Sequence, residues 1–250
     1  KKKGSKAIDS RLHWHCHFIQ KLESEPELEH RELHPYMSGI RKSNLIFLDA
    51  WSNGNTGVPF IDACMRALNN HGWINFRMRA MLMSFASYQL WLPWQESGLY
   101  LARKFVDYEP GIHWAQCQMQ SGTTSINSLR IYNPIKQGYE HDPKGIFIRT
   151  WVKELQEVPT MYIHKPWEVN LFHRNDSSLV FGTNYPLPIV DPISSAKIAR
   201  EKLKGIRNKP GFFEQTNKIL TKHGSPKRRK FTSRKMKRNT DLPNQLTINF

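Results

Sequence analysis

The sequence predicts an all-α protein, and three observations favour that fold class. Apolar residues in two segments, 59–70 and 75–91, recur three and four positions apart, as on the buried face of a helix. Helix starts carry the expected signals: Asp191 precedes Pro192, an N-cap residue followed by proline at the first helical position. No apolar–polar alternation lasts long enough to indicate a sheet, and no internal repeat is visible.

The expected elements follow in order along the chain. The first helix passes through Leu12, Phe18 and Leu22 and ends near the acidic segment 24–30. Further helices are expected at 44–51, 59–70, 75–91, 95–106, the first part of 111–133, 146–154, and from Asp191 to about Leu203. Before the last helix, prolines indicate an extended or turn-rich connection, at positions 159, 166, 186, 188 and 192.

The chain of 250 residues is long enough for one domain with a substantial core. We expect a disordered basic leader at 1–6, a helical domain at 7–206, and a segment at 207–250 that is first helical and then basic and flexible. No apolar run approaches ~18 residues and no signal peptide is visible, so no membrane association is predicted. Scattered cysteines indicate a reducing, cytoplasmic compartment: Cys16, Cys64 and Cys117.

The formal net charge of +16 is the strongest compositional indication of a partner. A basic chain attracts polyanions, and counterion release supplies most non-specific affinity for nucleic acids. Ten Lys or Arg and no acidic residue lie between Lys218 and Arg238. This basic segment is either a solvated, disordered tail or an arm that lies on DNA phosphates, and the sequence leaves both interpretations open.

Two further patterns suggest sites. Arg77 and Arg79 lie among methionines and aromatic residues, where a guanidinium needs an anionic partner, and Asp107 and Glu109 offer carboxylates downstream. The histidines of the segment 13–17 are spaced as zinc ligands on a helix. No carboxylate or second cysteine completes a ligand set there, so we assign no metal.

Three segments together resemble the flavin-binding helical domain of the cryptochrome/DNA photolyase family. They are RLHWHCHF at 11–18, the stretch from Thr56 to Pro110 that includes RMR and FVDYEP, and SGTTSINSLRIYNPIKQGYEHDPKGIFIRTWVKEL at 121–155. The resemblance covers residues 7–206 and implies FAD as the cofactor. The family's N-terminal α/β antenna domain and flavin phosphate loop have no counterpart before Arg11. We therefore expect a truncated chain, with a naturally short relative as the alternative.

The resemblance implies roles for residues near the flavin. Arg79 and Asp107 match the arginine–aspartate pair beside the isoalloxazine, and Glu109 stands where the family has a second aspartate. A fixed ion pair at the ring's polar edge would stabilise a reduced, anionic flavin. His113 is the nearest candidate to face flavin N5, where the family has asparagine. The alternative is that these charges form an ordinary salt bridge of a helix bundle.

The family also reduces its flavin through a chain of tryptophans. Trp94 matches the middle member and Trp114 is the nearest candidate for the proximal one. The outer position falls at Arg41, so another route would need Trp51, Trp73 or Trp91. Each of these tryptophans is equally consistent with ordinary packing in the core.

Some residues match the family's substrate-binding positions and others do not. Trp14 matches the aromatic wall for a flipped base, Arg77 and Gln137 match DNA contacts, and Arg130 lies in the same signature. At four other positions this chain has a residue that differs from the family's substrate-pocket residue: Arg11, His15, Phe76 and Ala80. Three functions therefore remain: a DNA-repairing photolyase, a cryptochrome-type blue-light receptor without repair, and a flavin-deficient DNA-binding remnant. We expect a monomer with DNA, damaged duplex in particular, as the partner.

Overall fold

The protein, as seen in a computed structural model, is built from helices, which confirms the predicted all-α class. The structure describes residues 2–169 and 184–223, and this part of the chain contains no β-strand. Its α-helices are α1 (Lys2–Ser24), α2 (Leu45–Ser52), α3 (Pro59–His71), α4 (Phe76–Ser84), α5 (Trp94–Lys104), α6 (Pro110–Ser121), α7 (Pro134–His141), α8 (Ile146–Trp151), α9 (Pro192–Arg207) and α10 (Phe212–His223).

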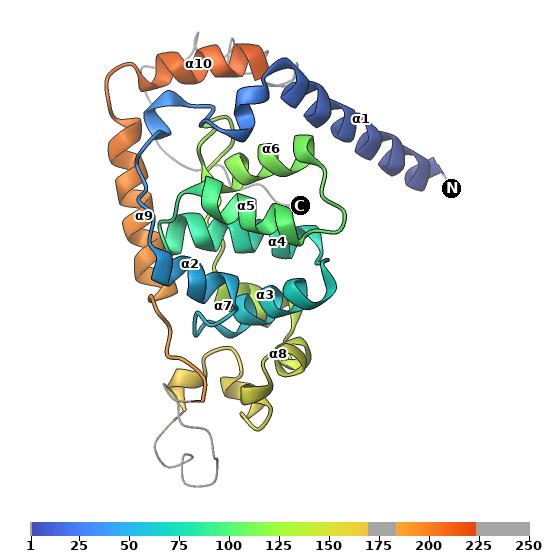
Figure 1. Ribbon diagram of the computed structural model, residues 1–250, viewed down its shortest axis with the longest axis vertical. Coiled ribbons are helices and arrows are strands. Elements are labelled where there is room, and N and C mark those ends of the chain that lie inside the picture. Colours follow the sequence, from blue (N-terminus) through green and yellow to red (C-terminus); the bar gives the residue numbers. More distant parts are fainter. Residues whose placement is uncertain (1, 170–183, 224–250) are drawn as a thin grey trace.

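The helices α4, α5 and α6 pack on one another at the centre of the molecule, and α3 joins them to α7 and α8 (Figure 1). Along one side runs α9, and α10 crosses the end next to α1. The long helix α1 packs against α6 and then extends outward to the N-terminus. The centre of the fold therefore holds the segments that carry the charged candidates Arg79 and Asp107.

Several boundaries differ from the predicted ones. Residues 2–6, expected as a disordered leader, form the first turns of α1, because no proline interrupts them and the single glycine, Gly4, weakens a helix without ending it. The helix α7 was not predicted, although Asn133 before Pro134 repeats the signal seen at Asp191–Pro192. The helix expected at 75–91 changes at Phe85 into a π-helix, η3 (Phe85–Gln89).

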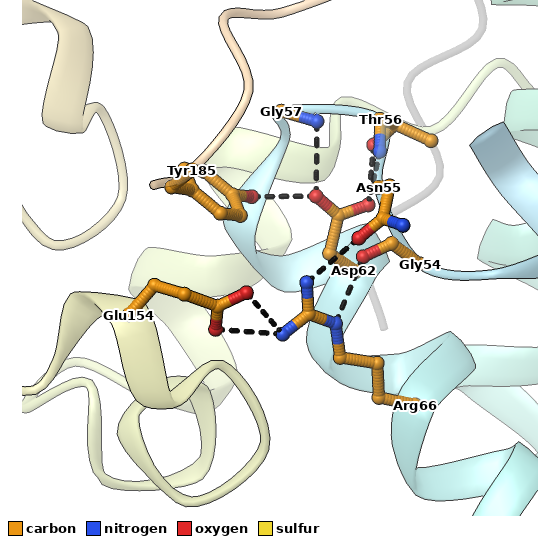
Figure 2. Close-up of polar contacts among 8 residues, drawn as sticks. All are labelled: Gly54, Asn55, Thr56, Gly57, Asp62, Arg66, Glu154 and Tyr185. Atoms are coloured by element: carbon orange, nitrogen blue, oxygen red, sulfur yellow. Dashed lines mark hydrogen bonds and ion pairs between the residues drawn. The ribbon is translucent and has the colours of Figure 1, made fainter. Parts of the chain in front are cut away.

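The buried Asp62 and the partly buried Arg66 and Glu154 connect α3 to distant segments (Figure 2). The Asp62 carboxylate is fully buried in α3 and accepts hydrogen bonds from the backbone and hydroxyl of Thr56, the Gly57 amide and the Tyr185 hydroxyl. One turn on, Arg66 donates to both oxygens of Glu154 at 2.9 and 2.8 Å. Gly57 adopts φ +77°, and a Cβ there would lie 2.4 Å from the Leu187 carbonyl carbon. These contacts fix α3, against which α4 packs.

In the described residues, no helix is long and apolar enough to cross a membrane. The C-terminal segment begins, as expected, with a helix, α10, which buries Phe212, Thr216 and Ile219. The greater part of the basic segment predicted at 218–238 lies outside the described residues.

Candidate functional site

The predicted pair of Arg79 and Asp107 is present as an ion pair. Arg79 lies on α4, and its Nη2 is 2.9 Å from Oδ2 of Asp107 in the loop after α5. The same guanidinium donates from Nε to the Ile74 carbonyl at 2.8 Å and lies 4.1 Å from the ring centroid of Phe105. Because three groups hold the arginine, its charge has a fixed position while the aspartate stays half-exposed.

Glu109 stabilises the start of helix α6. It is the N-cap of α6, and its two carboxylate oxygens accept from the amides of Gly111 and Ile112 at 3.0 and 2.7 Å. An acidic N-cap both satisfies free amides and complements the helix dipole. The predicted role of Glu109 toward a ribose or ring edge stays a prediction.

His113 lies one turn into α6 and is buried. Its Nε2 is 2.9 Å from the Gly98 carbonyl oxygen and 3.4 Å from Sγ of Cys117. Burial lowers the pKa of His113 to about 4, so the imidazole is neutral at pH 7. Burial likewise raises the pKa of the Cys117 thiol, which stays protonated. The histidine therefore presents a neutral hydrogen-bonding edge rather than a cation.

These residues surround a cavity of about 220 Å³. Its walls include Arg79, Asp107, Glu109 and His113, together with apolar side chains from α4, α5 and the following loop: Phe76, Met83, Leu101 and Phe105. A larger cavity, of about 650 Å³, lies between α1 and α6 and shares Phe76, Ile112 and Gln116 with the first. The buried Oε1 of Gln116 has no hydrogen-bond partner, so an unsatisfied acceptor stands at the shared wall.

Trp14 lines the larger cavity from α1. Its indole is 51% exposed and lies against His17 and Phe18, with ring centroids 5.6 and 5.8 Å apart. Arg11 and His15 line the same cavity. An exposed indole at the mouth of an apolar cavity has its face available for stacking.

The structure does not bring the predicted DNA-contacting residues to Trp14. Arg77 and Gln137 instead share a separate cavity of about 300 Å³, which Asn75 and His141 also line. Arg77 is exposed, while the buried Gln137 donates from Nε2 to Glu140 at 3.0 Å. Arg130 is exposed in the loop before α7. The family resemblance grouped these residues by matching positions, and matching positions do not give the direction in which each helix faces.

The tryptophans predicted as electron carriers do lie together. The ring centroids of Trp94 and Trp114 are 5.9 Å apart in an edge-to-face arrangement, and both indoles are buried. Trp114 in turn contacts His113 at the cavity wall, with a centroid distance of 4.9 Å. Among the possible alternatives, Trp51 is buried against Tyr100 and Trp73 is 55% exposed. In the described residues, no group of three metal-ligating side chains occurs, and His13 instead contacts Asp9.

The structure thus presents a helical domain with a fixed ion pair at an apolar cavity, and comparisons with known proteins identify the family to which such a domain belongs here. Residues 8–205 match the model of the FAD binding domain of DNA photolyase. The chain is 36% identical over 190 residues to a deoxyribodipyrimidine photo-lyase of Alkalihalophilus pseudofirmus, which covers 72% of this chain and 38% of that protein. It is 26% identical over 212 residues to cryptochrome-1 of Aedes aegypti, covering 82% and 39%.

Solved structures of photolyases are also similar to this chain. A class III photolyase from Agrobacterium tumefaciens superposes with a TM-score of 0.75 at 29% identity, covering 81% of this chain and 43% of that one. An archaeal photolyase from Sulfolobus tokodaii with two FAD molecules gives 0.72 at 30% identity, covering 81% and 45%. The chain belongs to the cryptochrome/DNA photolyase family and spans less than half the length of these relatives.

FAD is therefore the cofactor, as the sequence predicted, and the residues present fit it. Ligand pockets commonly enclose about 300–1,000 Å³. The cavity of about 220 Å³ is smaller than that, but together with the adjoining one of about 650 Å³ it falls within the range. Apolar walls would cover the ring faces, Arg79 and Asp107 would face the polar edge, and the free Gln116 oxygen could accept from a ring N–H. Bound FAD supplies a light-absorbing group that transfers single electrons.

Sequence reasoning missed Gln116. The signal was available, since Gln116 follows His113 by three positions and so shares its face of α6. The segment around Gln116 departs from the family's pattern, so the resemblance assigns this residue no role.

Proposed function

We propose that this chain is the flavin-binding part of a photolyase-type enzyme that uses light-driven electron transfer from reduced FAD to split a pyrimidine dimer in DNA. One observation carries the proposal: the cavity with the Arg79–Asp107 pair shares a wall with the cavity that holds the exposed indole of Trp14. A base extruded from the duplex could stack on Trp14 beside the flavin. The names of several relatives, such as the deoxyribodipyrimidine photo-lyases, support the same activity.

The residues have separate tasks in this proposal. The Asp107 carboxylate holds the Arg79 guanidinium in place, and the positive charge of Arg79 would stabilise negative charge on the flavin. The neutral His113 keeps a polar contact at the cavity wall without adding a second cation. The net charge of +16 attracts the phosphate backbone, which positions the duplex without reading its sequence.

A cryptochrome-type receptor without repair is the second candidate, and the larger cavity favours it. Arg11 and His15 line this cavity at positions where the resemblance implies a carboxylate and an arginine that contact the damaged bases. Exchanging a hydrogen-bonding acid for a cation changes what the cavity can recognise. In that case light would reduce the flavin, and no dimer would be split.

The flavin site is tested by Asp107→Asn. Because the substitution removes the counter-charge of Arg79, affinity for FAD should fall by about tenfold, equivalent to about 1.4 kcal/mol. Equilibrium titration of the purified protein with FAD, followed by absorbance, measures this. Asp49→Asn on the exposed surface of α2 is the matched control and should bind like the parent. Equal affinities in all three proteins would remove Asp107 from the site.

Repair is tested by illuminating the FAD-loaded protein with a duplex that contains one pyrimidine dimer and measuring dimer loss by chromatography. Trp14→Ala should weaken the preference for damaged over intact duplex by about 1–3 kcal/mol, the value of one stacked base. Leu12→Ala, exposed on the same helix, is the control. Flavin photoreduction without dimer loss would instead support the receptor.

A further inference from the structure

Glu32 makes an unexpected contact with the electron-carrying tryptophan. It lies in the segment after η1 (Pro26–Glu29), and its Oε1 accepts hydrogen bonds from Nε1 of Trp94 at 3.2 Å and Nε2 of Gln95 at 3.1 Å. Trp94 itself is 1% exposed. A buried indole has little direct access to water, so the carboxylate is the group placed to take a proton from its ring nitrogen.

Trp94 is also on the path to the flavin cavity. It lies 5.9 Å from Trp114, and Trp114 lies 4.9 Å from His113, a residue of the cavity wall. These are short, edge-to-face contacts between aromatic rings. An electron that moves toward the flavin can therefore be drawn from Trp94 through Trp114.

Trp91 is the nearest tryptophan in sequence that could extend the path, and its surroundings oppose that role. Two cations lie over its ring, with Arg41 and Lys202 at 4.8 and 4.7 Å from the centroid. Burial lowers the pKa of Arg41 to about 10, which still leaves the guanidinium charged at neutral pH. Removing an electron from an indole that has two cations close to its ring is unfavourable. Its Nε1 donates to the Ile40 carbonyl, which cannot accept a proton in exchange.

We propose that electron transfer ends at Trp94 and that Glu32 is the proton acceptor that makes this end point stable, an inference that rests on the proposed flavin photochemistry. When bound and excited by light, oxidised FAD would serve as the one-electron oxidant, and Trp94 would give up the electron by way of Trp114. Losing that electron makes the indole N–H strongly acidic. The Nε1–H bond breaks, the proton passes to Oε1 of Glu32, and a neutral tryptophan radical remains.

The position of Glu32 also accounts for the fate of the proton. Glu32 and Trp94 line a cavity of about 410 Å³ together with the exposed residues His30 and Arg31. Glu32 is only half-buried, so water in this cavity can take up the proton. Once the proton has left, an electron can return to Trp94 only if the ring nitrogen also takes up a proton again. The reduced flavin therefore persists.

Flash photolysis of the FAD-loaded protein tests the proposal, because the cation and neutral radicals of tryptophan absorb differently in the visible range. In the parent, the neutral radical should form promptly after the flash. Glu32→Gln keeps an acceptor for the Trp94 hydrogen bond but cannot take the proton, so neutral-radical formation should slow by about a hundredfold, as for the loss of a positioned base. Glu96→Gln, a carboxylate on the first turn of α5 that contacts Ser43, should match the parent.

A second measurement uses the flavin-free protein. The Trp94 indole N–H resonance in an NMR spectrum should have a different chemical shift in Glu32→Gln than in the parent and in Glu96→Gln, because the acceptor of its hydrogen bond changes from a carboxylate to an amide. An identical chemical shift in all three proteins would overturn the proposal whether or not flavin binds. Unchanged neutral-radical kinetics in Glu32→Gln, with normal flavin reduction, would also overturn it while leaving the proposed function intact. Absence of any light-driven flavin reduction in the parent would instead refute the proposed photochemistry itself.

Discussion

His113 shows how burial of one residue sets a charge at the flavin cavity. The side chain is 8% exposed, and desolvation lowers its pKa to about 4, although a hydrogen bond to the Gly98 carbonyl opposes the shift. The unfolded chain has a histidine pKa of about 6.5, so between these two values the unfolded state binds more protons than the folded state. Stability must then fall as the pH falls through this window.

We expect the free energy of unfolding to decrease by about 2 kcal/mol between pH 7 and pH 5 through His113 alone. His113→Asn should remove that part of the pH dependence, because asparagine does not titrate. Urea unfolding of parent and variant at the two pH values measures the difference. Gln116→Asn, which changes a side chain of the same helix that does not titrate, is the control and should leave the pH dependence as in the parent. Equal pH dependence in His113→Asn and the parent would show that folding does not lower the pKa of this histidine.

Among the elements, α3 organises the packing around the site. Its first turn carries Asp62, whose four hydrogen bonds join the turn at Thr56 and Gly57 to Tyr185 (Figure 2). Burial raises the pKa of Asp62, and the donors around it oppose that shift. A buried carboxylate with this many donors is costly to remove, because each donor left without a partner loses its hydrogen bonds without regaining water.

Asp62→Ala should therefore destabilise the protein by about 1–3 kcal/mol for each buried donor left unsatisfied. The melting temperature from differential scanning calorimetry, together with urea unfolding, measures the loss. Asp49→Ala on the exposed face of α2 should change stability by no more than about 0.5 kcal/mol. A melting temperature close to that of the parent would mean that water replaces the carboxylate in this network.

At the scale of the whole molecule, charge is unevenly distributed along the chain. Eight Lys or Arg lie between residues 224 and 238, in the part of the chain that follows α10. The described structure refines the experiment, because α10 buries Phe212, Thr216 and Ile219 and should be kept intact. A truncated variant that tests the basic segment should therefore end at His223.

Deletion of residues 224–250 should lower affinity for intact and damaged duplex alike. It should also flatten the plot of log K against log salt by about 0.9 for each phosphate that the shortened chain no longer neutralises. Fluorescence anisotropy with a labelled duplex at several salt concentrations gives this slope. Deletion of residues 239–250, which contain no Lys or Arg, is the matched control. A salt slope unchanged by the longer deletion would show that the basic segment does not bind DNA.

The sequence by itself determined the helical class, most helix positions and the cofactor. Spacing of apolar residues and cap signals act locally, so they can be read from a single chain. The ion pair of Arg79 and Asp107 was also predicted. The two residues are 28 positions apart, and it was the family resemblance that indicated that they are partners. The helix α7 could have been found from Asn133 and Pro134 by the same local rule.

Only the tertiary structure decided which side chains face one another. It separated Trp14 from Arg77 and Gln137, placed the free oxygen of Gln116 between two cavities, and brought Glu32 to Trp94 across 62 positions of sequence. The physical reason is that such contacts depend on how each helix is rotated and packed. That rotation follows from burial of the whole core and is not encoded in the spacing within any one segment.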